Sequence, residues 1–105
     1  MGLPELGSPW WSYQLMVDGQ VVGDIGFHGP LDDQQQVTIG YQVVPSAQGR
    51  GLATAACAMI IQLAWSAGAR RLLASTDADN VASRRVLRRN GFHTEDGRTF
   101  MLDKP

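Results

Sequence analysis

The sequence predicts an α/β fold of the α+β sandwich kind: two helices packed on a mixed, mostly antiparallel sheet with a central parallel pair. Three observations predict it. Strand-like segments flank Asp-Gly dipeptides at 18–19 and 96–97, and Asp-Gly is a strong hairpin signal. Two segments, near 48–67 and 81–90, have helical periodicity instead. A short apolar run between these helices has the character of a buried strand. The predicted order is therefore β-β-β-α-β-α-β-β.

The first half of the chain supplies three strands. Moderate alternation places the first two near 11–17 and 21–28, joined by the Asp-Gly turn. The polar stretch 29–35 contains a proline and predicts a loop. The third strand is expected at 36–44, and alternation puts four of its side chains on one face. These are Val37, Ile39, Tyr41 and Val43.

The second half begins with the longest helical pattern, at about 48–67, which Gly68 should terminate. Its apolar stripe should bury against the sheet. The stripe consists of Leu52, Ala55, Ala56, Met59, Ile60, Leu63 and Ala67. A buried strand follows at 71–76. Asp79 or Asn80 can cap the next helix, and the last two strands are expected at 92–95 and 98–102.

Composition limits the class of protein. A chain of 105 residues predicts one domain, here residues 10–105 after a flexible lead-in at 1–9. A net charge of −1 gives no reason to expect a nucleic-acid partner. One cysteine excludes an internal disulfide, and two separated histidines predict no metal site. No apolar run is long enough to predict a membrane span, so we expect a cytoplasmic protein.

The junction between the third strand and the long helix, residues 43–54, is the most informative stretch. The first N–H groups of a helix have no partner inside the helix, and the helix dipole adds positive charge there. Gly49 and Gly51 allow close approach to the backbone, and Arg50 adds a fixed charge. The junction therefore predicts an anion site suited to a pyrophosphate. An ordinary strand-to-helix turn is the alternative on this pattern alone.

The junction resembles the acyl-CoA pyrophosphate loop of the GCN5-related N-acetyltransferases, the GNAT family. That loop has the form Gln/Arg-x-x-Gly-x-Gly/Ala, which Gln48, Gly51 and Ala53 match. The chain is most similar to the ribosomal-protein N-terminal acetyltransferase branch, in the order and spacing of several short motifs over roughly 55 residues. These are Ile39-Gly40-Tyr41, Pro45, Gly49 to Thr54, Asn80 to Ser83, Val86-Leu87 and Gly91-Phe92.

The resemblance implies transfer of acetyl from acetyl-CoA to an amine, on a small molecule or at a protein N-terminus. It implies that the backbone of Val43 and Val44 pairs with pantetheine, and that Asn80 hydrogen-bonds near it. Asn80 and Ser83 are the candidate catalytic residues, with Ser83 facing the thioester sulfur. A plain helix cap and a polar helix start are their structural alternatives. Gln48 is a further candidate for cofactor binding. The pyrophosphate would be held by the N–H groups of Gly49, Arg50, Gly51, Leu52, Ala53 and Thr54.

Two positions depart from the family pattern. Thr38 stands where many members have a Glu base, and Leu87 where many have a Tyr acid. Asp77 and Asp79 are substitute base candidates or ordinary turn residues. At pH 7, deprotonating a lysine costs roughly 4–5 kcal/mol but an α-amine only about 1 kcal/mol. A site without a strong base therefore favours direct attack by an α-amine or another weakly basic amine.

The chain is too short for the strand and two helices that begin the family domain. A truncated GNAT fold would leave part of the sheet bare, so we expect a homodimer or a partner that completes the acceptor wall. A non-catalytic CoA-binding or interaction domain is the rival interpretation, and a fragment of a longer enzyme is another. The helix at 81–90 carries four arginines. These are Arg84, Arg85, Arg88 and Arg89. Either they form a solvated basic face, or one of them contacts the CoA 3′-phosphate.

Overall fold

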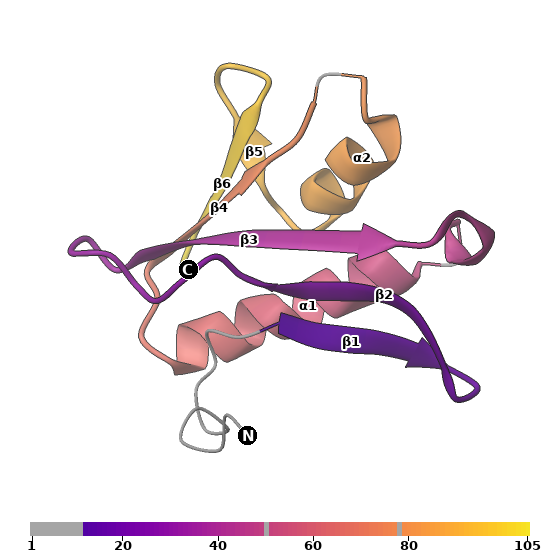
Figure 1. Ribbon diagram of the computed structural model, residues 1–105. Helices are drawn as coiled ribbons and strands as arrows, with labels where there is room; N and C mark the ends of the chain where they lie inside the picture. The colour runs from indigo at the N-terminus through magenta and orange to yellow at the C-terminus, as the bar shows by residue number, and fades with distance from the viewer. Residues whose placement is uncertain (1–11, 50, 78) are drawn as a thin grey trace.

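The computed structural model describes residues 12–49, 51–77 and 79–105. The predicted lead-in at 1–9, the start of the first strand at residue 11, and Arg50 lie outside the described residues. One six-stranded sheet has the order β1-β2-β3-β4-β6-β5 (Figure 1). The strands are β1 (Ser12–Val17), β2 (Gln20–Phe27), β3 (Gln36–Val43), β4 (Arg71–Ser75), β5 (His93–Thr94) and β6 (Thr99–Asp103). The two α-helices are α1 (Leu52–Ser66) and α2 (Val81–Arg89). The predicted fold class and element order are confirmed, and the boundaries differ by one to four residues.

The first hairpin forms at the predicted turn. Asp18 and Gly19 both have positive φ, at 52° and 80°, which matches the right-handed twist of the strands that they join. β1, β2 and β3 pair antiparallel in sequence. The meander places the end of β3 next to the start of α1.

β3 and β4 form the predicted parallel pair, but only over a short length. Three residue pairs join them, from Gln36 with Arg71 to Thr38 with Leu73. β3 then continues for five residues and diverges from β4, as Figure 1 shows. From Ile39 onward, no described strand pairs with this edge of β3, so the sheet is open beside the helices.

The long helix begins later than the sequence predicts. A short 3-10 helix, Pro45–Ala47, and an extended Gln48 precede it, and α1 starts only at Leu52. Gly49 and Gly51 have φ of 80° and 77°, in the left-handed region. Two left-handed residues interrupt a right-handed helix, so the start expected at 48 was wrong.

The buried face of α1 also differs from the predicted stripe. Met59 is 74% exposed and Leu63 36% exposed, whereas Cys57 and Ile61 are buried. Apolar residues surround most of this helix, so the periodicity could not fix which side faces the sheet. Packing selected a face made of Ala56, Cys57, Ile60, Ile61 and Ala64.

Both helices pack on the same face of the sheet, where one continuous core joins them to the strands. Its largest fully buried side chains are Phe100, Ile39, Leu72 and Leu87. The opposite face carries polar side chains at paired positions, among them Gln14, Asp24 and Gln42, all exposed. Since these three side chains are exposed, no described element covers them. No described helix is long and apolar enough to cross a membrane.

Candidate active site

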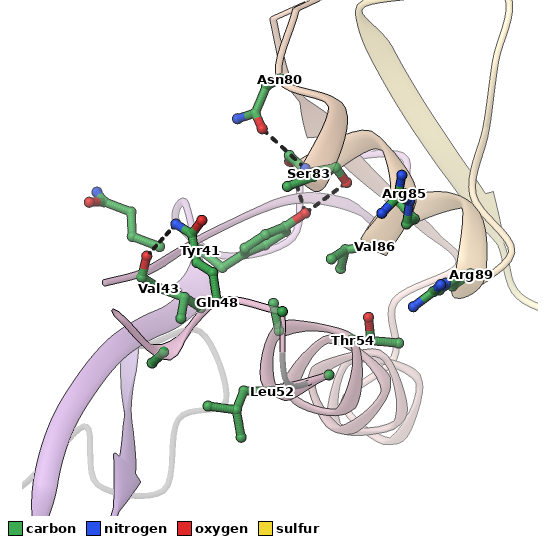
Figure 2. A pocket seen from close by; sticks show the side chains of 16 residues that line it. Tyr41, Val43, Gln48, Leu52, Thr54, Asn80, Ser83, Arg85, Val86 and Arg89 are labelled. Carbon is green, nitrogen blue, oxygen red and sulfur yellow. Dashed lines mark hydrogen bonds between the residues drawn. The ribbon is translucent and has the colours of Figure 1, made fainter. Parts of the chain in front are cut away.

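A cleft of about 520 Å³ lies where the diverging end of β3, the start of α1 and the start of α2 meet (Figure 2). Its walls are Tyr41, Gln42 and Val43 from β3, the loop before α1, the first turn of α1, and one side of α2. The loop and α1 contribute Ala47, Gln48, Gly49, Gly51, Leu52, Ala53 and Thr54, and α2 with its cap contributes Asn80, Ala82, Ser83, Arg85, Val86 and Arg89.

The two glycines of the loop border open space. A Cβ built on Gly49 or Gly51 would have no heavy atom within 4 Å beyond the chain neighbours. Packing therefore does not require glycine at either position. The positive φ values require it, because a side chain is strained in that conformation. The loop consequently presents bare backbone to the cleft.

The start of α1 is not capped by a side chain. Gly51 is its N-cap residue, and no side chain of the described residues accepts from its first amides. The first intrahelical bond runs from the Ala55 N–H to the Gly51 carbonyl, at 3.0 Å. The amides of Leu52, Ala53 and Thr54 therefore precede the helical ladder, beside the cleft that these residues line. Together with the helix dipole they make an anion site.

The backbone of β3 distinguishes Val43 from Val44. The carbonyl of Thr38 and the amide of Val44 face β2, at 2.8 Å from their partners on His28 and Val22. Successive residues of a strand direct their backbone N–H and C=O groups to opposite edges, so those of Tyr41 and Val43 face the open edge. The Val44 carbonyl accepts from Ala47, at 2.9 Å. Val44 thus uses both backbone groups inside the fold and does not line the cleft.

Gln48 braces the loop. Its side-chain amide donates to the Val43 carbonyl at 2.9 Å (Figure 2). Gln48, which belongs to the predicted motif, therefore connects the loop to β3. Gln48 also lines the cleft. Ala47, in the same loop, is buried.

Asn80 and Ser83 lie at the opposite wall, at the start of α2. The Asn80 Oδ1 accepts from the Ser83 amide at 3.1 Å, which is the ordinary capping arrangement. The phenol oxygen of Tyr41 lies 2.9 Å from the Ser83 Oγ, where either hydroxyl can donate, and 3.0 Å from the Ser83 carbonyl oxygen, which can accept from the phenol. In Figure 2 the Tyr41 side chain reaches from β3 across to α2.

Burial controls the ionisation of Tyr41. Desolvation raises the pKa of its phenol, and the Ser83 hydrogen bond only partly opposes that effect. The phenol therefore stays protonated at neutral pH and acts as a hydrogen-bond donor in the wall of the cleft.

The four arginines of α2 do not share one face. Arg85 and Arg89 both line the cleft (Figure 2). Arg84 and Arg88 lie over the Phe100 ring, with guanidinium carbons 5.3 and 5.5 Å from its centroid. Arg84 also donates to the Gly97 carbonyl. One pair is available to a ligand and the other holds α2 to β6.

The residues that depart from the family pattern are placed elsewhere. Leu87 is fully buried and belongs to the core. Thr38, Asp77 and Asp79 do not line the cleft. In the described ranges, no three His, Cys, Asp or Glu side chains are grouped as a metal site would require.

Sequence reasoning missed the Tyr41 phenol as a contributor to the cleft, and it left open which of the four arginines of α2 would face a ligand. Tyr41 was assigned only to a strand face, because nothing in its spacing relates it to a serine 42 residues later. The separation of the arginines follows from helical geometry, since positions 85 and 89 share one side and 84 and 88 another. Which side faces the cleft depends on where Phe100 lies.

Comparisons with known proteins agree with this geometry. A family model described as the acetyltransferase (GNAT) domain matches residues 5–93. YoaA of Bacillus subtilis (strain 168), named as an uncharacterized N-acetyltransferase, is 30% identical over 86 residues, which are 81% of this chain and 49% of that protein. The chain thus spans about half the length of this curated relative.

Two solved structures illustrate the similarity in fold. RimJ of Mycobacterium smegmatis, in complex with CoA-disulfide, has 29% identity and a TM-score of 0.75, over 88% of this chain and 52% of RimJ. The ribosomal-protein-S5-alanine acetyltransferase of Vibrio fischeri has a TM-score of 0.74 over 84% of this chain and 59% of that structure. At 19% identity, the second comparison supports the fold alone.

Proposed function

The chain belongs to the GNAT acetyltransferase family, and from that premise we propose that its cleft binds acetyl-CoA and that acetyl is transferred to an amine. One observation carries the proposal. The start of α1 has no side-chain cap and follows two glycines with left-handed backbone conformation. It lies beside the edge of β3 that β4 has left unpaired. That combination fits a ligand with a pyrophosphate at one end and an extended amide-bearing arm.

The lining residues suggest how acetyl-CoA would lie. The pyrophosphate would accept from the amides of Leu52, Ala53 and Thr54 at the start of α1. The pantetheine arm would run along the open edge of β3 and pair with backbone groups of Tyr41 and Val43. This arrangement would bring the thioester toward the start of α2, where Asn80 and Ser83 lie.

The other end of the cofactor would reach α2 near its last turn. Arg85 and Arg89 line that part of the cleft, and neither is in a salt bridge with a described residue. Their guanidinium groups suit the CoA 3′-phosphate, because planar guanidinium donors match phosphate oxygens well.

The chemistry would be direct attack of a neutral amine on the acetyl carbonyl carbon. A new N–C bond forms, the C–S bond breaks, and its electron pair moves to sulfur. The nitrogen then loses its extra proton to water. Neither Thr38 nor buried Leu87 can exchange that proton, so positioning would supply much of the acceleration. An α-amine is the preferred acceptor class, on a small molecule or a protein N-terminus, because it is neutral more often than a lysine side chain.

The first test is calorimetric titration with acetyl-CoA and, for comparison, CoA. Micromolar binding at one site per chain is expected. The second test measures thiol release with amines of graded pKa, and the rate should fall steeply as acceptor pKa rises. A flat dependence on pKa would contradict direct attack without a base, and no binding at millimolar acetyl-CoA would contradict the whole proposal.

A CoA-binding domain without catalysis is the second candidate function. The absence of a base at Thr38 and of an acid at Leu87 favours it. Binding of acetyl-CoA without thiol release to any amine of the panel would support this candidate over the enzyme.

A homodimer, in the cytoplasm where an acetyl-CoA pool is available, is part of the proposal. Two observations support self-association. Met59 and Leu63 lie one turn apart on the solvent side of α1, and β1 is an edge strand of the sheet. Light scattering at micromolar concentration should give twice the chain mass, and a monomer would contradict the proposal.

A further inference from the structure

The Tyr41 phenol joins the diverging end of β3 to the start of α2 by hydrogen bonding to Ser83. Its oxygen lies 3.0 Å from the Ser83 carbonyl and 2.9 Å from the Ser83 Oγ. The two residues are 42 positions apart in sequence, and both line the cleft. The contact therefore belongs to the site as well as to the fold.

Ser83 is fixed at three of its atoms. Asn80 accepts from its amide, while the phenol contacts its carbonyl and its hydroxyl. The phenol has one proton and two acceptors within reach, so two arrangements are possible. If Tyr41 donates to the carbonyl, the Ser83 hydroxyl can donate back to the phenol. If Tyr41 donates to Oγ, the Ser83 proton is free to point into the cleft.

We infer that Tyr41 is a positioning residue that orients the Ser83 hydroxyl so that Ser83 donates to the CoA sulfur when the thiolate leaves. The inference rests on the proposed function and names how the same site stabilises the departing group. An anionic acceptor in the cleft selects the second arrangement, because the chain Tyr41 O–H to Ser83 Oγ–H to sulfur polarises each hydrogen bond in the same sense.

The step balances without ionising either hydroxyl. As the C–S bond breaks, the electron pair goes to sulfur, and the thiolate accepts a hydrogen bond from Ser83. A thiol has a pKa of about 8–9, so a hydrogen-bonded thiolate is an adequate leaving group at neutral pH. Sulfur later takes its proton from water. Tyr41 remains a neutral donor throughout, in agreement with the raised pKa of its buried phenol.

The test uses CoA as the probe, so it does not depend on knowing the acceptor. Ultraviolet absorbance of the thiolate gives the pKa of the CoA thiol, bound and free. Wild-type protein should enrich the bound thiolate about tenfold, which is a pKa lower by about one unit. Ser83→Ala should abolish the enrichment, and Tyr41→Phe should reduce it to about threefold. The double variant should match Ser83→Ala, because Tyr41 acts only through Ser83.

The thiol of the protein itself adds little signal. It has a single cysteine, Cys57, and burial raises the pKa of that thiol to about 12, well above the range of the titration. Tyr13→Phe is the matched control, because it removes the only other phenol of the chain from a strand outside the cleft. It should leave the enrichment at the wild-type value.

Three results would overturn the inference. One is full enrichment in Tyr41→Phe, and another is a further loss when Tyr41→Phe is added to Ser83→Ala. The third is an unchanged enrichment in Ser83→Ala, which would mean that the Ser83 hydroxyl does not contact the sulfur. Urea unfolding verifies that each variant is folded before its enrichment is compared. Calorimetry with CoA separates these results from failure of the proposed function, since in that case the wild type would not bind CoA.

Discussion

The two helices that border the cleft begin in opposite ways. α2 is capped, because the Asn80 side chain accepts from the Ser83 amide. α1 has glycine as its N-cap residue and no described side chain on its first amides. Both starts line the same cleft. The fold satisfies one helix end internally and leaves the other for an external acceptor, which locates the anion-binding end of the cleft at α1.

The largest expected effect comes from placing a carboxylate at each helix start in turn. Ala53→Asp puts a negative charge at the second position of α1 and should weaken acetyl-CoA binding about hundredfold, because the charge competes for amides that the pyrophosphate needs. The helix should not lose stability, since an acidic first turn favours the dipole by about 0.3–1 kcal/mol.

Ala82→Asp is the matched variant, at the second position of α2. It should weaken binding by only about threefold, a small long-range repulsion. Calorimetry with acetyl-CoA measures both affinities. Equal losses in the two variants would remove the distinction between the helix starts.

The next effect concerns the two sides of α2. Replacing Arg85 and Arg89 with Gln should weaken acetyl-CoA binding about tenfold, as expected for the loss of charge-assisted hydrogen bonds to a phosphate. The difference from wild type should vanish with 3′-dephospho-CoA as ligand. If the deficit persists with that ligand, the pair does not meet the 3′-phosphate.

The control for that pair is on the same helix. Gln at positions 84 and 88 should leave acetyl-CoA affinity unchanged, because Arg84 and Arg88 lie over Phe100 instead. It should lower the free energy of unfolding by about 0.5–1 kcal/mol per cation–π contact. Urea unfolding measures this loss.

A smaller effect separates the two roles of Asn80. Asn80→Ala should lower the free energy of unfolding by about 1 kcal/mol, because the cap of α2 is lost. Asn80→Asp keeps a capping oxygen but loses the amide donor. It should unfold like wild type yet bind acetyl-CoA about fivefold more weakly, through one lost hydrogen bond. Wild-type affinity in Asn80→Asp would leave Asn80 as a helix cap and nothing more.

The smallest effect concerns the buried side of α1. Burial raises the pKa of Cys57 from 9.0 to about 12, so the unfolded chain ionises first as pH rises. The stabilisation is fully present below pH 9 and is lost between 9 and about 12. Cys57→Ala should flatten the fall of unfolding free energy with pH. The raised pKa of Tyr41 acts in the same direction, so part of the slope should persist. An unchanged slope would contradict this account of Cys57.

The fold was predictable because local signals agreed with it. Asp18-Gly19 set the first hairpin, and Gly68 lies just beyond the end of α1, where it was expected. The face of α1 was not predictable in the same way. Its apolar residues surround the helix, so Met59 and Leu63 were expected in the core but are exposed. Only the sheet that the helix packs against could choose between its sides.

The sequence by itself determined the family, the order of elements and the anion-binding character of the junction. Those features depend on residues close together in the chain, whose φ preferences, capping and spacing act locally. The tertiary structure decided which groups share the cleft. Both backbone groups of Val44 bond within the fold. Arg85 and Arg89 line the cleft, whereas Arg84 and Arg88 do not. Tyr41 contacts Ser83, which is 42 positions later in the sequence. Such contacts follow from the divergence of β3 from β4 and the position of Phe100, which no local pattern specifies.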